Sequence, residues 1–79
     1  MSNLNEEMVF FSSTEMTPGH QVRVFTSPHN GEVKVHVREY YLHRLTGEYT
    51  IGRGMTFPAH CIEEVIQGLI LAQEALEKG

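Results

Sequence analysis

Cationic and aromatic side chains alternate with valines along residues 33–41, whose sequence is VKVHVREYY. Successive side chains of a β-strand point to opposite faces. The side chains that would share one face are Lys34, His36, Arg38 and Tyr40. Lysine and arginine bind phosphates, and flat aromatic rings stack on unpaired bases. The row therefore predicts a surface for single-stranded nucleic acid, with an ordinary solvated sheet face as the alternative.

The preceding segment carries a second set of such side chains. In residues 21–27, QVRVFTS, Val22 and Val24 alternate with Arg23 and Phe25. The same alternation puts Arg23 and Phe25 on the face opposite to these valines. Two neighbouring strands would thus present cations and rings together, which extends the predicted surface across a sheet.

Catalysis and metal binding are poorly supported by the remaining polar residues. The chain has no aspartate, no phosphate-binding loop and no CxxC motif, and its single cysteine excludes an intrachain disulfide. His60 lies beside Cys61, but neighbouring residues on a helix point apart and no spacing matches a closed zinc site. We therefore expect no enzyme activity, no metal and no cofactor. Histidines on a binding face would instead give a mild pH response, because they gain charge near pH 6.

Charge is unevenly distributed along the chain, whose net charge is −4. Residues 20–57 carry five arginines or lysines against three glutamates, together with four of the five histidines. Both flanking segments are acidic. Charge asymmetry within a chain is more informative than the total, so the basic middle keeps a nucleic-acid partner open.

Four strands and one helix must position these residues. The predicted strands lie near residues 8–13, 21–27, 33–43 and 49–57. Asn30-Gly31 predicts a tight hairpin between the second and third strands, and Gly52 and Gly54 indicate a bulge or a close backbone approach in the last. Hairpin connections make the sheet antiparallel. The predicted fold class is α+β: a curved four-stranded antiparallel sheet followed by one C-terminal helix, which packs on the valines.

The helix is predicted from about Pro58 to Lys78, with Thr56 as its N-cap. Its apolar residues follow the 3-4-3-4 spacing of a coiled-coil seam. This stripe is wider than one small sheet requires, and a chain of 79 residues has few other stabilisers. We therefore expect a homodimer whose interface buries one set of helix residues: Ile62, Val65, Ile66, Leu69 and Ile70.

Residues 37–57, VREYYLHRLTGEYTIGRGMTF, resemble the positive cofactor four family of transcriptional coactivators. That family has an I-R-E-Y-aromatic strand end, a turn with Gly-Glu, and Pro-Gly-Arg-Lys-Gly-Ile-Ser-Leu before a helix. At these places this chain has Arg38-Glu39-Tyr40-Tyr41, Gly47-Glu48 and Gly52-Arg53-Gly54. The resemblance covers roughly residues 20–75, with the same order of elements.

The resemblance implies a homodimer that binds single-stranded DNA across its sheets with little sequence preference, in transcription or genome maintenance. RNA stays open as a partner. The implied contacts are Arg38, Tyr41 and Arg53, with Arg23 and Phe25 in a looser alignment. A contact from Tyr41 requires a bend or bulge, because alternation puts Tyr40 on the cationic face. The full set of candidate nucleic-acid contacts is Arg23, Phe25, Lys34, His36, Arg38, Tyr40, Tyr41 and Arg53.

Several cations of the family are missing from this chain. Residues 29–32, HNGE, stand where the family has a lysine-bearing hairpin, and Thr50 and Ile51 replace its Lys-Pro. Each lost phosphate contact lowers the log–log salt slope of single-strand binding by ~0.7. We expect weaker DNA binding than in a typical member. A protein-interaction module on the same fold is the alternative function.

The N-terminus has no targeting pattern. Residues 1–10, MSNLNEEMVF, contain no lysine or arginine and carry Glu6 and Glu7, unlike a signal peptide. No apolar run is long enough to span a bilayer. We expect a flexible segment over residues 1–7 and one domain over residues 8–79. The expected location is the cytoplasm, with nucleoid association in a bacterium and a transcription or replication protein as a further partner.

Overall fold

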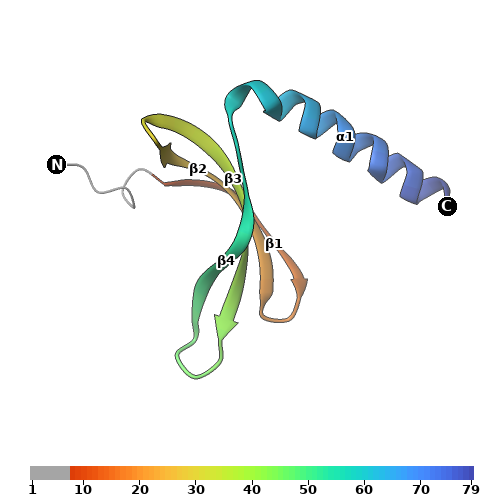
Figure 1. Cartoon of the computed structure of the whole chain (residues 1–79). Coiled ribbons are helices and arrows are strands. Elements are labelled where there is room, and N and C mark those ends of the chain that lie inside the picture. Colours follow the sequence, from red (N-terminus) through yellow and green to blue (C-terminus); the bar gives the residue numbers. More distant parts are fainter. Residues whose placement is uncertain (1–7) are drawn as a thin grey trace.

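The computed structural model describes residues 8–79 as one antiparallel sheet followed by one helix (Figure 1). Its elements are β1 (Val9–Thr17), β2 (His20–His29), β3 (Glu32–His43), β4 (Glu48–Phe57) and α1 (Ala59–Lys78). The strands lie side by side in chain order, and each pairs antiparallel with the next. The predicted fold class is confirmed. The segment expected to be flexible, residues 1–7, lies outside the described residues.

The β2–β3 hairpin has the turn that its sequence predicts. Asn30 and Gly31 have φ angles of 53° and 83°, as a two-residue turn matched to the strand twist requires. The first strand is longer than predicted. It continues past Ser13 to Thr17, because Glu15 still pairs with Gln21.

The two faces of the sheet differ in chemistry. Cross-strand pairs place one set of rings on the same side, which we call the ring face: Phe10, Phe25, His36, Tyr40 and Tyr49. The other side, the valine face, carries Val22, Val24, Val33, Val35 and Val37. α1 lies on the valine face, where Ile62, Val65, Ile66 and Leu69 oppose Val24, Val35, Val37 and Phe57.

Burial is concentrated on the ring face. Phe25 is 2% exposed, and His36 and Tyr40 are each 7% exposed, whereas no residue of α1 is buried. The expectation that Phe25, His36 and Tyr40 face solvent is therefore wrong. Their rings pack against one another across the strands, so the core of the single chain lies on the side that the helix leaves uncovered.

α1 makes only a loose contact with the sheet. A hollow of about 210 Å³ with an apolar lining remains between them, and Figure 1 shows the helix running away from the sheet after its first turns. Ile62 and Val65 are half-buried, while Ile66, Leu69 and Ile70 are exposed. The single chain thus leaves most of the predicted dimer interface open to solvent. Within residues 8–79, no helix is both long enough and apolar enough to cross a membrane.

The helix begins one residue later than predicted and without the predicted cap. Pro58 occupies the N-cap position, and no side chain caps the helix there. The prediction of Thr56 as N-cap is wrong, because the Thr56 hydroxyl is engaged on the ring face with Arg38 and His36.

Candidate nucleic-acid interface

Three rings form a row across β1, β2 and β3. Phe25 pairs with Phe10 on one side and with His36 on the other. The Phe10 and Phe25 ring centroids are 4.8 Å apart, and Phe25 and His36 stack at 4.9 Å with their planes 6° apart. Aromatic cross-strand pairs of this kind stabilise a sheet. Phe25 is consequently enclosed by protein rings and has little surface left for a ligand.

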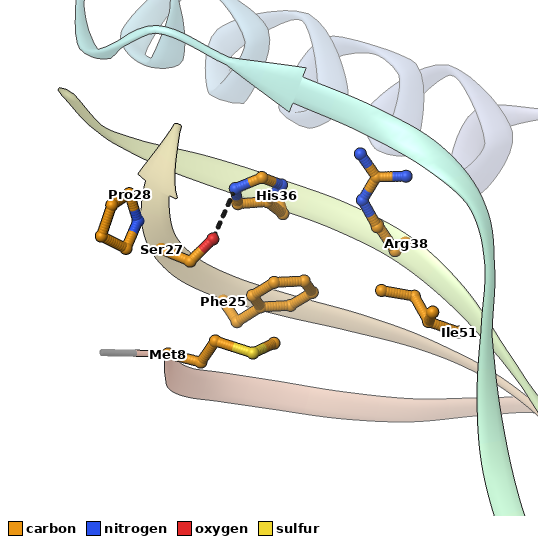
Figure 2. Close-up of a pocket in the computed structure, with 7 residues that line it drawn as sticks. All are labelled: Met8, Phe25, Ser27, Pro28, His36, Arg38 and Ile51. Carbon is orange, nitrogen blue, oxygen red and sulfur yellow. Dashed lines mark hydrogen bonds between the residues drawn. The ribbon is translucent and has the colours of Figure 1, made fainter. Parts of the chain in front are cut away.

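Hydrogen bonds hold His36 in place at the end of this row. Its Nε2 is 2.9 Å from Ser27 Oγ, and its Nδ1 is 3.1 Å from Thr56 Oγ1. Arg38 Nη2 donates to the same Thr56 oxygen at 3.1 Å. Figure 2 shows Ser27 and His36 facing each other beside Phe25, with Arg38 further along β3. The buried imidazole thus joins β2, β3 and β4 through paired polar atoms, as burial requires.

A shallow hollow of about 290 Å³ opens beside this network (Figure 2). Its wall combines apolar and polar side chains: Met8, Phe25, Ser27, Pro28, His36, Arg38 and Ile51. Arg38 is half-buried and is anchored by one nitrogen. A guanidinium has five N–H donors, so Arg38 can also bind an anion at the rim of the hollow.

Arg23 lies among the remaining rings of the ring face. Its guanidinium carbon is 4.3 Å from the Tyr40 ring centroid, 4.9 Å from that of Tyr49 and 6.0 Å from that of Phe10. Arg23 Nε also donates to Gln21 Oε1 at 3.0 Å. The cation of β2 is therefore held against rings from the other three strands by cation–π contacts.

Burial raises the pKa of the Tyr40 phenol above its ordinary value, although Arg23 and Arg38 act in the opposite direction. The ordinary value is 10.0. Tyr40 therefore stays neutral at physiological pH and adds no negative charge beside the arginines and Lys34 of this face.

A second polar cluster lies on the valine face, at Tyr41. The Tyr41 and His20 rings stack at 4.6 Å, and His20 Nε2 is 3.0 Å from Glu39 Oε1. Hydrogen bonds from Tyr41 and His20 hold the pKa of Glu39 below its ordinary value. The hydrogen bond between Tyr41 and Glu39 raises the pKa of the Tyr41 phenol, and burial and the negative charge of Glu39 raise it further. Arg53 interacts electrostatically with Glu39 and Tyr41.

An extra residue in β4 sets which side chains reach the ring face. Arg38 pairs with Gly54, and Tyr40 pairs with Ile51, so β4 uses three steps where β3 uses two. A shift of one residue moves a strand's side chains to the other face. This bulge lets Thr56 and Tyr49 point to the same face although their numbers differ in parity. The predicted bulge at the glycines is confirmed.

Two glycines of β4 make room for parts of β3: the Tyr41 ring at Gly52, and the backbone of Val37 and Arg38 with the base of the Arg38 side chain at Gly54. A Cβ on Gly52 would come within 2.7 Å of Tyr41 Cε2, and one on Gly54 would come within 2.6 Å of Arg38 Cα and Cγ. The Gly-Arg-Gly segment therefore accommodates Tyr41 on one face and Arg38 on the other.

The candidate contacts do not share one surface. Six lie on the ring face: Arg23, Phe25, Lys34, His36, Arg38 and Tyr40. Tyr41 and Arg53 lie on the valine face, because the bulge belongs to β4 and β3 keeps its alternation. Within the described range, no group of three His, Cys or Glu side chains converges to hold a metal ion.

Phe10 and Tyr49 also belong to the ring face, and sequence reasoning missed both. Phe10 lies in an unpatterned apolar run, VFF. Tyr49 lies beyond the bulge, where simple alternation along residues 48–57 predicts the wrong face. Pairing of Tyr49 with Leu42 settles its position.

Comparison with known proteins identifies a shared fold. No protein-family model matches this chain, and no curated protein matches it either. Two crystal forms of BPSL1147, a PC4 homolog from Burkholderia pseudomallei, superpose on it with a TM-score of 0.76 each. The orthorhombic form is 23% identical and covers 86% of this chain and 92% of that chain. The tetragonal form is 24% identical, with 85% and 98% covered. PC4 stands for positive cofactor four. This chain therefore has the PC4-like fold that its sequence resemblance implied.

Proposed function

We propose that this protein is a homodimer that binds single-stranded DNA with little sequence preference, in transcription or genome maintenance in the cytoplasm. It is a binding protein in this proposal and has no catalytic role. One observation carries it: the sheet face that α1 leaves uncovered combines Arg38 and Lys34 with a set of aromatic rings. Cations and rings together are what a phosphate backbone and unpaired bases require. The fold shared with a PC4 homolog supports the same role.

The proposed dimer forms through α1. Ile66, Leu69 and Ile70 expose apolar surface along one side of the helix, and the hollow under α1 has an apolar lining. A second α1 packed on this surface would remove it from water, at roughly 25 cal/mol for each Å² of apolar area. The proposed dimer would then carry two ring faces, one from each subunit.

Binding to a fluorescent oligo-dT and to duplex DNA, at low and moderate salt, tests the function. We expect affinity for oligo-dT that falls with salt and exceeds that for the duplex. Arg38→Ala should weaken binding to all sequences alike and lower the log–log salt slope by ~0.7, because a phosphate contact carries no sequence information. Arg44→Ala is the matched control, since it removes the same charge from the exposed β3–β4 turn. Absence of oligo-dT binding at low salt would refute the proposal.

A protein-interaction module is the second candidate, and burial on the ring face favours it. Phe25, His36 and Tyr40 expose little surface, and the net charge of −4 opposes polyanions. Under this alternative, oligo-dT does not bind at any salt concentration, and Arg38→Ala changes only the melting temperature.

A further inference from the structure

Base stacking requires a ring with an open face, and only part of the ring face offers one. Phe25 and Tyr40 are buried, and His36 lies against Phe25 with both nitrogens hydrogen-bonded. Phe10 is 48% exposed, and Tyr49 is half-exposed. The accessible rings are therefore those on the outer strands β1 and β4, at the two sides of the sheet.

Arg23 connects these two rings. Its guanidinium carbon lies 4.9 Å from the Tyr49 ring and 6.0 Å from the Phe10 ring, with the buried Tyr40 ring nearer at 4.3 Å. Gln21 Oε1 accepts a hydrogen bond from Arg23 Nε and another, at 2.9 Å, from Ser13 Oγ. The guanidinium is thus oriented from the side by an amide and held against rings from three strands. Arg23 as a whole is half-buried, whereas an arginine that only contacts phosphate could remain mobile and exposed.

We propose that Tyr49 and Phe10 are the rings that stack on unpaired bases, and that Arg23 is a positioning residue that holds them rather than a phosphate contact. This inference rests on the proposed function, because it assigns roles within the same surface. A flat guanidinium lies against ring faces in a way that the compact ammonium of lysine does not. The two roles for Arg23 therefore predict different results when its charge is kept and its shape is changed.

The stacking role is tested with Tyr49→Leu and Phe10→Leu, which keep apolar side chains in the strands. The ligands are oligo-dT and an abasic deoxyribose-phosphate strand of the same length and charge. Loss of a stacked ring should lower oligo-dT affinity about 5- to 150-fold and leave abasic-strand affinity unchanged. Phe57→Leu is the control, because Phe57 is an aromatic residue of the valine face. Equal losses for both ligands, or no loss in either variant, would overturn the stacking role.

The positioning role is tested with Arg23→Lys and Arg23→Gln. If Arg23 holds the rings, both variants lose oligo-dT affinity to a similar extent and keep the parent's salt slope. Adding Tyr49→Leu to Arg23→Lys should then cost less than the two separate losses predict, since both act through one contact. If Arg23 binds a phosphate, Arg23→Lys keeps most of the affinity and Arg23→Gln lowers the slope by ~0.7. That second pattern would refute the positioning role.

A measurement without nucleic acid separates this inference from the proposed function. In the free protein, protons of the Arg23 side chain should resonate upfield because they lie over aromatic rings. Tyr49→Leu should reduce this upfield shift, and Phe57→Leu should leave it unchanged. If oligo-dT does not bind the parent protein, the stacking role falls with the proposed function. The ring-current shift then decides alone whether Arg23 holds Tyr49, and a shift unaffected by Tyr49→Leu would disprove it.

Discussion

Residue 54 has to be glycine, because β3 leaves no room for a side chain there. A methyl group there would meet Arg38 Cα and Cγ at 2.6 Å and would also strike the Val37 carbonyl oxygen. Gly54→Ala should lower the free energy of unfolding by about 1–3 kcal/mol, since overpacking forces the backbone to shift. Chemical denaturation measures this. The control is Gly68→Ala in α1, where an added methyl meets open space and alanine should add ~1 kcal/mol. Unchanged stability of Gly54→Ala would contradict the close approach.

Glu39 should make stability depend on pH on the acid side. Hydrogen bonds from Tyr41 and His20 lower its pKa from the ordinary value of 4.5. A carboxyl group whose pKa is lowered in the folded state stabilises the fold above pH 4.5, and this stabilisation is lost as the pH falls through the folded-state pKa. Glu39→Gln should therefore be less stable than the parent at pH 6, with the difference shrinking below pH 4.5. Urea denaturation across this range measures it, and a constant difference would argue against the assignment.

Among single residues, the alternation predicted the sheet face of three cations correctly and the exposure of two rings incorrectly. Alternation correctly placed Arg23, Lys34 and Arg38 on one face, since β2 and β3 pair without interruption. It did not find that Phe25 and Tyr40 are buried, because their cover comes from Phe10 and other rings on separate strands. Burial of this kind depends on pairing across the sheet and leaves no trace in the local pattern.

α1 is the element whose exposed surface most needs a partner. Leu69 is 65% exposed in the single chain, so a charge there costs little unless another surface covers it. In the proposed dimer, Leu69→Glu should dissociate or unfold the protein, because a buried charge without a partner is expensive. The molar mass of the variant, measured by light scattering, should fall to that of one chain, 9.0 kDa.

Leu71→Glu is the matched control for this helix. Leu71 is 63% exposed, which is similar to the exposure of Leu69. Because it lies two positions further along the helix, its side chain points to another side of α1. It should keep the dimer intact. A parent protein that scatters as a monomer, or equal effects of both substitutions, would contradict an interface along Leu69.

Elements were predicted well where the signal is local. The Asn30-Gly31 turn and the 3-4 spacing after Pro58 each specify a structure within a few residues, and both agree with the fold. The β4 bulge was expected from its glycines, but its consequence for Tyr49 was not. Which residue is the extra one is decided by pairing with β3, and the pattern along β4 alone does not contain that information.

For the whole molecule, the proposed dimer links folding to protein concentration. The single chain has its best-buried residues on the ring face and leaves α1 loosely attached. If association supplies the missing burial, the melting temperature should rise with protein concentration by mass action. Differential scanning calorimetry from micromolar to submillimolar protein checks this. A melting temperature independent of concentration would indicate that the chain is stable alone.

The bulge in β4 also predicts how this strand tolerates changes in length. Removing either Gly52 or Arg53 would remove the extra residue and make the spacing from Tyr49 to Thr56 even, so simple alternation would keep both side chains on the ring face. A deletion in the exposed turn at residues 44–47 leaves the pairing of both strands intact. Among natural or engineered versions of this chain, single-residue gaps should therefore collect in the turn or at residues 52–53, because both places keep Tyr49 and Thr56 on the ring face.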